Sequence, residues 1–367
     1  MSRSGFMIYG AYGYTGELIA RQAVARGHRP LLAGRRRSEL DRLASELRLD
    51  TVCVALEDTD GLVRALEQVD VVCHAAGPFL HTSAAMLEAC LAARTSYVDI
   101  TGEIGVFRDV FARHAEAERA GIALLPGAGF DVVPSDCLAR FVADAVPDAD
   151  ELVIAFASLG RPSAGTAKAS FEGVLRGNFV RRGGQLSEIA WGEGVREVRF
   201  SDRARTALPI PWGDLETAYR TTGIPNITTL MAVPEGAGRL LALARPVTTA
   251  FLPTLMAGLG ATGVRELALS AIERYVKNPD ARARQAGRAY LWARASAPNG
   301  AGREAWLETV DGYALTAESA VLALEKVQAL RPVGALTPAR AFGADFVLEI
   351  GGSVRHERLP PVPPRRG

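Results

Sequence analysis

Residues 6–26 read FMIYGAYGYTGELIARQAVAR, in which a short apolar run is followed by a loop with three glycines and then by a segment of helical periodicity. The glycines are Gly10, Gly13 and Gly16, so their spacing is GxxGxxG, a variant of the dinucleotide-binding fingerprint. Glycine suits such a loop because the chain must turn tightly, let a diphosphate approach the backbone and pack the next helix against the strand. The sequence therefore predicts a nucleotide site whose phosphates are held by N–H groups at the helix start.

The residues between these glycines, Tyr12, Tyr14 and Thr15, are candidates for contacts with the same nucleotide. The alternative is that the glycines serve only a structural turn. A glycine triplet in isolation is weak evidence for a nucleotide site. Here it lies between a strand pattern and a helix pattern, which is the context that a nucleotide-binding loop requires.

Short apolar runs alternate with amphipathic segments over the first 130 residues. The strand-like runs are Phe6–Tyr9, Pro30–Ala33, Thr51–Ala55, Val69–His74, Tyr97–Ile100 and Ile122–Leu125. The helical segments are Gly16–Arg26, Arg37–Glu46, Thr59–Gln68, Ser83–Ala93 and Val106–Ala120. Such alternation is typical of α/β proteins with a parallel sheet. We therefore predict a Rossmann-type doubly wound parallel sheet over residues 1–135.

Three consecutive arginines, Arg35, Arg36 and Arg37, follow the second expected strand. A site that prefers NAD usually has an acidic residue here for the ribose 2′-hydroxyl, and this chain has none. Guanidinium groups hold a 2′-phosphate through charge-assisted hydrogen bonds. We predict that Arg35 and Arg36 select NADPH over NADH. The alternative is that they are ordinary solvated arginines at a helix start.

The ends of the fourth, fifth and sixth expected strands carry small and acidic residues. These ends are Ala75-Ala76-Gly77-Pro78-Phe79, Asp99-Ile100-Thr101-Gly102-Glu103 and Gly127-Ala128-Gly129-Phe130-Asp131. Ligands bind beyond the carboxyl ends of the strands in doubly wound folds. We expect the three segments to converge, with Ala76, Gly77, Pro78 and Phe79 beside the nicotinamide half of the cofactor. Asp99 and Glu103 are expected to orient backbone N–H groups.

The pattern changes near residue 135, and residues 136–330 are expected to form a second, α+β domain with an antiparallel sheet. The expected helices are Cys137–Ala145, Ala237–Leu243, Val264–Val276 and Ala314–Gln328. The expected strands are Leu152–Ser158, Val195–Phe200 and a hairpin of residues 287–296 and 302–310, joined by Pro298-Asn299-Gly300. Residues 357–367 are expected to form a flexible tail.

The composition restricts the classes of function that the protein can have. The 42 basic and 41 acidic residues leave a net charge of +1, which argues against a dedicated nucleic-acid-binding protein. The four cysteines lie in apolar runs and the N-terminus has no signal-peptide pattern, so we expect a cytoplasmic protein. The uncharged stretch Pro246–Val264 is interpreted as a dimer interface or buried helix pair, or else as a patch that accepts an acyl chain or contacts a membrane surface.

Five motifs together resemble those of the saccharopine dehydrogenase-like oxidoreductases. They are GAYGYTG at 10–16, AAGPF at 75–79, YVDITGE at 97–103, PGAGFDVVPSD at 126–136 and GALTPAR at 334–340. The chain length and the GFDVVPSD segment resemble the branch called trans-acting enoyl reductases, whose members serve polyketide and lipid synthesis. Family members commonly have a tyrosine and a glycine-rich continuation after the fourth-strand Gly-Pro, whereas this chain has Phe79-Leu80-His81-Thr82.

The resemblance implies an oxidoreductase that uses NADPH/NADP⁺. It implies that the second domain closes over the substrate and forms a homodimer, and that the chain returns to the first domain over residues 331–356. The reaction that it implies is reduction of an activated carbon–carbon double bond on a small-molecule or acyl-type substrate. A synthase or carrier-protein partner would deliver such a polyketide-type intermediate.

Hydride transfer is the chemistry of the cofactor, so the protein must supply a proton. His81 is one candidate because it follows the Gly-Pro turn and because histidine titrates near neutrality. His74 is a second candidate for the same reason, but because it lies at an apolar strand end we interpret it as a core residue. Asp131 is a candidate for a substrate or ribose contact, against a helix-capping role, and Lys168 is a candidate against the alternative of a solvated lysine. The five histidines are scattered, and no metal site is expected.

Two other functions stay open on the sequence alone. One is reduction of an imine, or oxidation of a secondary amine, on an amino-acid-derived substrate. The carboxylates of such a substrate would require cationic groups, which Arg161, Arg176, Arg181 and Arg182 can supply. The other is a non-catalytic NADP-binding protein, for which we expect cofactor binding without turnover.

Overall fold

The computed structural model describes residues 5–158, 160, 162–175, 177–234 and 262–359. The chain divides into two compact units, the first formed by Met1–Val133 with Gly312–Ile350 and the second by Pro134–Asp311 with Gly351–Gly367. The second unit begins close to the expected boundary at residue 136, whereas the return to the first unit is at Gly312 rather than at residue 331. Arg161, Arg176 and residues 237–243, 246–261 and 360–367, to which the sequence assigned roles, lie outside the described residues.

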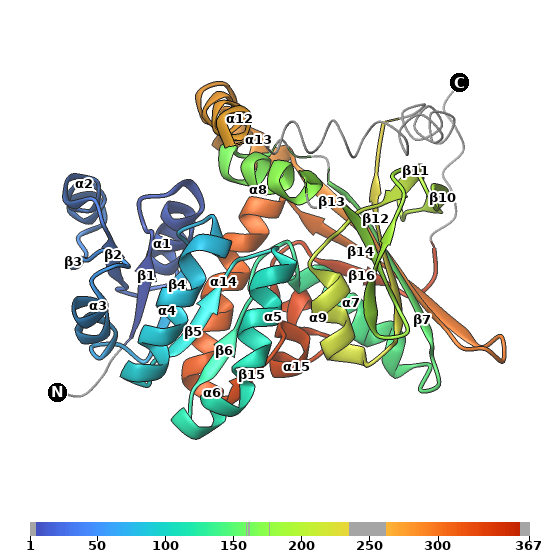
Figure 1. Ribbon diagram of the computed structural model, residues 1–367, viewed down its shortest axis with the longest axis horizontal. Coiled ribbons are helices and arrows are strands. Elements are labelled where there is room, and N and C mark those ends of the chain that lie inside the picture. The colour runs from blue at the N-terminus through green and yellow to red at the C-terminus, as the bar shows by residue number, and fades with distance from the viewer. Residues whose placement is uncertain (1–4, 159, 161, 176, 235–261, 360–367) are drawn as a thin grey trace. The chain divides into compact units, whose positions relative to one another are not determined.

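The first unit contains a sheet of parallel strands. They are β1 (Phe6–Tyr9), β2 (Leu31–Gly34), β3 (Thr51–Cys53), β4 (Val71–His74), β5 (Ser96–Asp99), β6 (Ala123–Leu125) and β15 (Gly334–Ala335). Their order is β15-β6-β5-β4-β1-β2-β3 (Figure 1). The predicted doubly wound sheet is confirmed, and β15 extends it beside β6. The strand order reverses between β1 and β4, where such sheets bind nucleotides.

The helices of the first unit are α1 (Tyr14–Ala25), α2 (Arg37–Leu47), α3 (Thr59–Leu66), α4 (Phe79–Ala93), α5 (Ile104–Ala112), α6 (His114–Ala120), α14 (Gly312–Leu330) and α15 (Pro338–Phe342), with the 3₁₀ turn η1 (Phe346–Glu349). Apolar side chains of α3 to α6 form one core with the sheet, including the fully buried Tyr97 and Phe107. The single helix expected over 106–120 is divided, because Arg113 (φ −87°, ψ 12°) leaves the helical conformation. Helix α4 begins before the expected Ser83, because the carboxylate of Glu103, which follows β5, accepts hydrogen bonds from the N–H groups at the start of the helix.

Helix α14 lies beside α1 and runs in the same direction. At the start of both helices, the rings of Tyr14 and Tyr313 meet edge to face with centroids 5.1 Å apart. Near the end of α1, Glu325 of α14 accepts hydrogen bonds from Arg26, the shorter at 2.7 Å, and lies 2.6 Å from Nε2 of His28. These contacts explain why residues 312–330, which we had expected in the second domain, belong to the first unit.

The second unit combines helices with a mixed sheet. Its strands are β7 (Glu151–Ser158), β8 (Asn178–Arg182), β9 (Gln185–Ile189), β10 (Arg196–Arg199), β11 (Ala204–Pro209), β12 (Asn226–Ala232), β13 (Arg288–Ser296), β14 (Gly302–Val310) and β16 (Val354–His356). Its helices are α7 (Val133–Asp144, which begins at the boundary), α8 (Ala164–Leu175), α9 (Asp214–Thr222), α12 (Thr262–Tyr275) and α13 (Ala281–Ala286). The main path is β10-β11-β12-β7-β13-β14-β16.

The predicted α+β character and the β13–β14 hairpin are confirmed. The expected antiparallel sheet has one exception, since β7 and β12 pair in parallel. Residues 354–356 had been expected to return to the first domain; they belong to the second unit because they pair with β14. None of the helices in the described part of the chain combines the length and the hydrophobicity that are needed to cross a membrane.

Candidate functional site

The glycine loop brings the end of β1 into direct backbone contact with its neighbours. Gly10 has a φ of +83°, and a Cβ there would lie 2.8 Å from the Cβ of Ala76. A Cβ on Gly16 would lie 2.2 Å from the carbonyl oxygen of Gly10. Gly13 is the N-cap of α1, and as a glycine it has no side chain that could accept a hydrogen bond from the first-turn N–H groups. This loop has the close approach and the amide donors that a diphosphate requires.

The end of β2 holds Tyr12 and Arg36 in a stack. A Cβ on Gly34 would lie 2.6 Å from Cε1 of Tyr12, so the ring lies against the backbone of that strand. The guanidinium carbon of Arg36 lies 4.5 Å from the centroid of the same ring, which is a cation–π contact. Arg35 and Arg36 are exposed, and among the described residues neither forms an ion pair with a carboxylate. Two unpaired cations beside the glycine loop fit the 2′-phosphate of NADP.

Glu103, which follows β5, caps the segment that follows β4. Its carboxylate accepts hydrogen bonds from the N–H groups of Phe79 (2.9 Å) and Leu80 (3.1 Å) at the start of α4. The exposed His81 lies in the first turn of this helix, next to the predicted Gly77 and Pro78. A carboxylate already occupies this helix N-terminus, so the diphosphate is better placed at α1.

Asp99 joins the ends of β5 and β6. Its carboxylate accepts hydrogen bonds from the hydroxyl of Tyr97 (2.6 Å) and from the N–H groups of Thr101 (3.0 Å) and Gly127 (2.8 Å). Burial raises the pKa of Asp99 to about 6 although these hydrogen bonds oppose the shift. The expectation that Asp99 and Glu103 orient backbone N–H groups is confirmed, and the three loops converge as predicted.

Asp131 lies half-buried after β6. A Cβ on Gly102 would lie 2.7 Å from Oδ2 of Asp131, so this carboxylate lies against the loop that follows β5. Burial, and then the nearby charge of Glu103, raise the pKa of Asp131 to about 6. Because such a group carries its proton in an appreciable fraction of molecules near neutral pH, it can act as a general acid.

Helix α14 contributes residues that the sequence did not point to. Thr316 accepts a hydrogen bond from the N–H of Phe130 (3.0 Å), and Ser319 donates one to the carbonyl of Ala128 (2.7 Å). Tyr313 contacts Tyr14 in the glycine loop. No local signal in the sequence identifies these three residues, because their partners are about 190 to 300 positions away.

His74 is buried within the core, as we had expected, and it is neutral. Its ring lies near those of Tyr9, Phe79 and Tyr97, at centroid distances of 5.7, 5.5 and 6.2 Å. Nε2 lies 3.0 Å from Oγ1 of Thr82. Burial lowers the pKa of His74 to about 3, which removes it from the candidate proton donors at neutral pH.

The low pKa of His74 predicts acid sensitivity. Between its ordinary pKa near 6.5 and the folded value of about 3, the unfolded chain binds a proton that the folded chain does not. Stability therefore falls as the pH decreases through this window, by up to about 1.4 kcal/mol for each pH unit. Between pH 6.5 and 4.5, the wild type should lose about 2 kcal/mol more unfolding free energy than His74→Phe, measured by urea denaturation. Parallel pH profiles would contradict this assignment.

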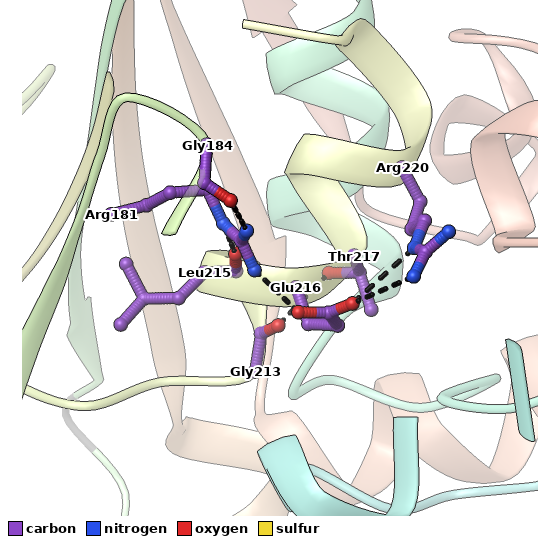
Figure 2. Close-up of polar contacts among 7 residues, drawn as sticks. All are labelled: Arg181, Gly184, Gly213, Leu215, Glu216, Thr217 and Arg220. Atoms are coloured by element: carbon purple, nitrogen blue, oxygen red, sulfur yellow. Dashed lines mark hydrogen bonds and ion pairs between the residues drawn. The ribbon is translucent and has the colours of Figure 1, made fainter. Parts of the chain in front are cut away.

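Three other predicted cationic residues lie in the second unit and have partners there. Lys168 of α8 forms an ion pair with Glu273 of α12 at 2.6 Å. Arg181, which the amine hypothesis assigned to a substrate carboxylate, is buried and binds Glu216 and the carbonyls of Leu215 and Gly184 (Figure 2). The exposed Arg182 lies 3.4 Å from Glu193. Because its donors are used internally, Arg181 is not available for a substrate.

The guanidinium of Arg181 also lies over the ring of Tyr219. The carboxylate of Glu216 binds a second arginine as well, since Nε of Arg220 lies 3.3 Å from its Oε1 (Figure 2). Removing one partner of a buried ion pair leaves the other charge uncompensated. This cluster therefore holds β8 to α9 within the second unit.

Among the described residues, no group of three or more His, Cys, Asp or Glu side chains is arranged to hold a metal ion.

Residues 6–125 match the family described as the saccharopine dehydrogenase NADP binding domain. Residues 6–125 thus form a domain of the saccharopine dehydrogenase NADP-binding type. The matched residues run from β1 to β6 and include the glycine loop, Arg35, Arg36 and the segment after β4. The cofactor of this saccharopine dehydrogenase-type domain is NADP, in agreement with the arginines at the end of β2.

The chain is similar to relatives with two kinds of name. A trans-acting enoyl reductase of Mycobacterium ulcerans is 30% identical over 234 residues, covering 61% of this chain and 49% of that protein. A saccharopine dehydrogenase-like oxidoreductase of Bos taurus is 26% identical over 150 residues, covering 35% of each. The chain spans between a third and a half of the length of the first such relatives.

A solved structure has the same fold over nearly the whole chain. Apo saccharopine dehydrogenase (L-Glu forming) from Saccharomyces cerevisiae aligns with a TM-score of 0.63, covering 94% of this chain and 96% of that one. The sequence identity is 12%, so the similarity concerns the fold. It includes both the parallel sheet and the second, mixed sheet.

Proposed function

We propose that the protein is an NADPH-dependent reductase that reduces an activated carbon–carbon double bond of an acyl or polyketide-type intermediate. The observation that carries the cofactor preference is the stack of Tyr12 and Arg36 on Gly34 beside the exposed Arg35, with no acidic side chain in these positions. NADPH supplies a hydride when it is bound. The chain must bind its phosphates and supply the proton that completes the reduction.

The roles follow from the site. The loop from Gly10 to Gly16 binds the diphosphate, and Arg35 and Arg36 bind the 2′-phosphate. Asp131 would donate the proton to the carbon of the double bond that does not receive the hydride, and its carboxylate would then be reprotonated from water. Its raised pKa and its place at the carboxyl ends of the strands support this role.

The double bond is preferred over an imine for two reasons. The relative that covers 61% of this chain is named a trans-acting enoyl reductase. In addition, Arg181 is used within the second unit, so it does not support the binding of an amino-acid carboxylate. We further propose that a synthase or carrier-protein partner presents the acyl substrate, and that the protein acts as a cytoplasmic homodimer.

The proposed acid predicts a pH profile for the reduction step. Only the protonated form of Asp131 donates, so the rate should be highest below the pKa of about 6 and should fall about tenfold per pH unit above it. Asp131→Asn should lower kcat by about 100-fold and remove this limb. The NADPH affinity should be unchanged, because Asp131 does not hold the phosphates. A retained pH limb in the variant would refute the role of Asp131.

The substrate class is tested by following NADPH consumption with enoyl thioesters and with cyclic imines, each over a range of chain lengths. The proposal predicts turnover of an enoyl thioester. Turnover of imines alone would favour the amine reaction. Tight NADPH binding without turnover of either class would favour a non-catalytic NADP-binding protein.

A further inference from the structure

Three hydrogen-bonding groups form a continuous chain beneath the segment that follows β4. Nε2 of His74 lies 3.0 Å from Oγ1 of Thr82, and the same oxygen lies 2.7 Å from the carbonyl oxygen of Ala76. His74 is fully buried at the end of β4, and Thr82 lies in the first turn of α4. The chain therefore connects the sheet core to the backbone segment that contacts Gly10.

The direction of the protons in this chain is fixed. The hydroxyl of Thr82 has one hydrogen, and the two carbonyl oxygens near it, of Ala76 (2.7 Å) and of Pro78 (3.1 Å), can only accept, the Ala76 contact being the shorter. Oγ1 must therefore accept from His74, so that Nε2 carries the proton and Nδ1 does not. Nδ1 is buried with no hydrogen-bond partner among the described residues, which is costly. The hydrogen bond that the structure shows for the ring of this histidine is thus the one that Nε2–H donates to Thr82.

Fixing the Ala76 carbonyl also fixes the next N–H group. The C=O and N–H of a trans peptide point in opposite directions, so Gly77 N–H points away from Thr82. Gly77 N–H has no acceptor within the described part of the chain. The neighbouring groups are accounted for, since Ala75 N–H donates to the carbonyl of Tyr9 (2.8 Å) and the N–H of Phe79 donates to Glu103.

We propose that His74 and Thr82 are positioning residues that aim Gly77 N–H at the nicotinamide half of NADP. This inference rests on the proposed function, because it presupposes that the cofactor binds at the carboxyl ends of the strands. The close contact between Gly10 and Ala76 places the Gly77 segment beside the glycine loop. The carboxylate of Glu103 already occupies the start of α4, which disfavours a negatively charged ligand group there. We therefore expect Gly77 N–H to donate to an uncharged acceptor. The phosphates bind instead at the start of α1 and at Arg35 and Arg36.

The test separates the two halves of the cofactor. Isothermal titration calorimetry measures the binding of NADPH and of 2′,5′-ADP, a fragment that lacks the nicotinamide, to the full-length protein. Thr82→Val removes the hydroxyl and nearly retains the shape. It should weaken NADPH binding by about tenfold, the loss expected of one hydrogen bond, and leave 2′,5′-ADP binding unchanged. Thr82→Ser retains the hydroxyl and should restore NADPH affinity.

Two further variants separate positioning from general destabilisation. Thr95→Val is a matched control, because the buried Thr95 also donates to a carbonyl, that of Leu66 (2.8 Å), but lies before β5 at the other end of the sheet. Thr95→Val should change neither the affinity for NADPH nor the affinity for 2′,5′-ADP. His74→Phe retains an aromatic ring without the N–H and should reproduce the NADPH-specific loss.

The outcomes distinguish this inference from the proposed function. Equal weakening of both ligands by Thr82→Val, or no weakening of either, would overturn the positioning role while the cofactor assignment stands. If the wild-type protein binds neither ligand, the proposed function fails and the inference fails with it.

Discussion

Gly10→Ala is expected to weaken NADPH binding by about 1000-fold. The added Cβ would lie 2.8 Å from Ala76 Cβ and 2.9 Å from its nitrogen, so the loop must move away from the segment after β4. The first-turn amides of α1 would then no longer face the diphosphate together. Losing two charge-assisted hydrogen bonds costs about 3 to 6 kcal/mol, which is consistent with this factor. Fluorescence titration with NADPH measures the change.

Gly27→Ala provides a matched control. Gly27 also has a positive φ, of +88°, but a Cβ there has no heavy atom within 4 Å. Both variants therefore carry the backbone strain of the left-handed conformation, and only Gly10→Ala disturbs the loop. Gly27→Ala should bind NADPH normally with a slightly lower melting temperature. Comparable loss of binding in both variants would show that strain, rather than displacement of the loop, is responsible.

Arg35→Ala/Arg36→Ala should reverse the cofactor preference. The double variant should bind NADPH about 1000-fold more weakly than the wild type, since each arginine contributes charge-assisted hydrogen bonds to the 2′-phosphate. NADH has no such phosphate, so its affinity should change little. Calorimetric titrations of both nucleotides measure the preference as a ratio. Parallel losses for NADPH and NADH would contradict the assignment of these arginines.

Arg37→Ala is the control for nonspecific charge. Arg37 is adjacent in sequence and also exposed, but it lies 4.0 Å from Asp41 on the same helix. The variant removes one positive charge, as each single substitution at Arg35 or Arg36 does. It should reduce NADPH affinity only slightly, through long-range electrostatics that added salt screens.

Much of the first unit was predictable because its elements are local. The alternation of apolar runs and amphipathic helices predicted β1 to β6, and the glycine spacing predicted the loop between β1 and α1. The convergence of the segments after β4, β5 and β6 follows from the rule that parallel strands end at one edge. The roles of Asp99 and Glu103 as acceptors for backbone N–H groups were predictable for the same reason.

The missed features depend on contacts between distant parts of the chain. Helix α14 has an ordinary amphipathic pattern, and nothing in it indicates that Tyr313 contacts Tyr14 or that Thr316 holds Phe130. Arg181 illustrates a different difficulty, because an arginine for a substrate and an arginine for a buried ion pair look alike in a sequence. Its partner Glu216 lies on α9, more than 30 residues later. Only the fold distinguishes the two roles.

Calorimetric titration of the full-length wild-type protein with NADPH and, separately, with NADH tests the central claim most directly. The glycine loop and the free arginines predict saturable binding of NADPH at one site per chain. They also predict that NADH binds at least 100-fold more weakly, because it lacks the 2′-phosphate. No binding of NADPH, or equal affinities for the two nucleotides, would contradict the account.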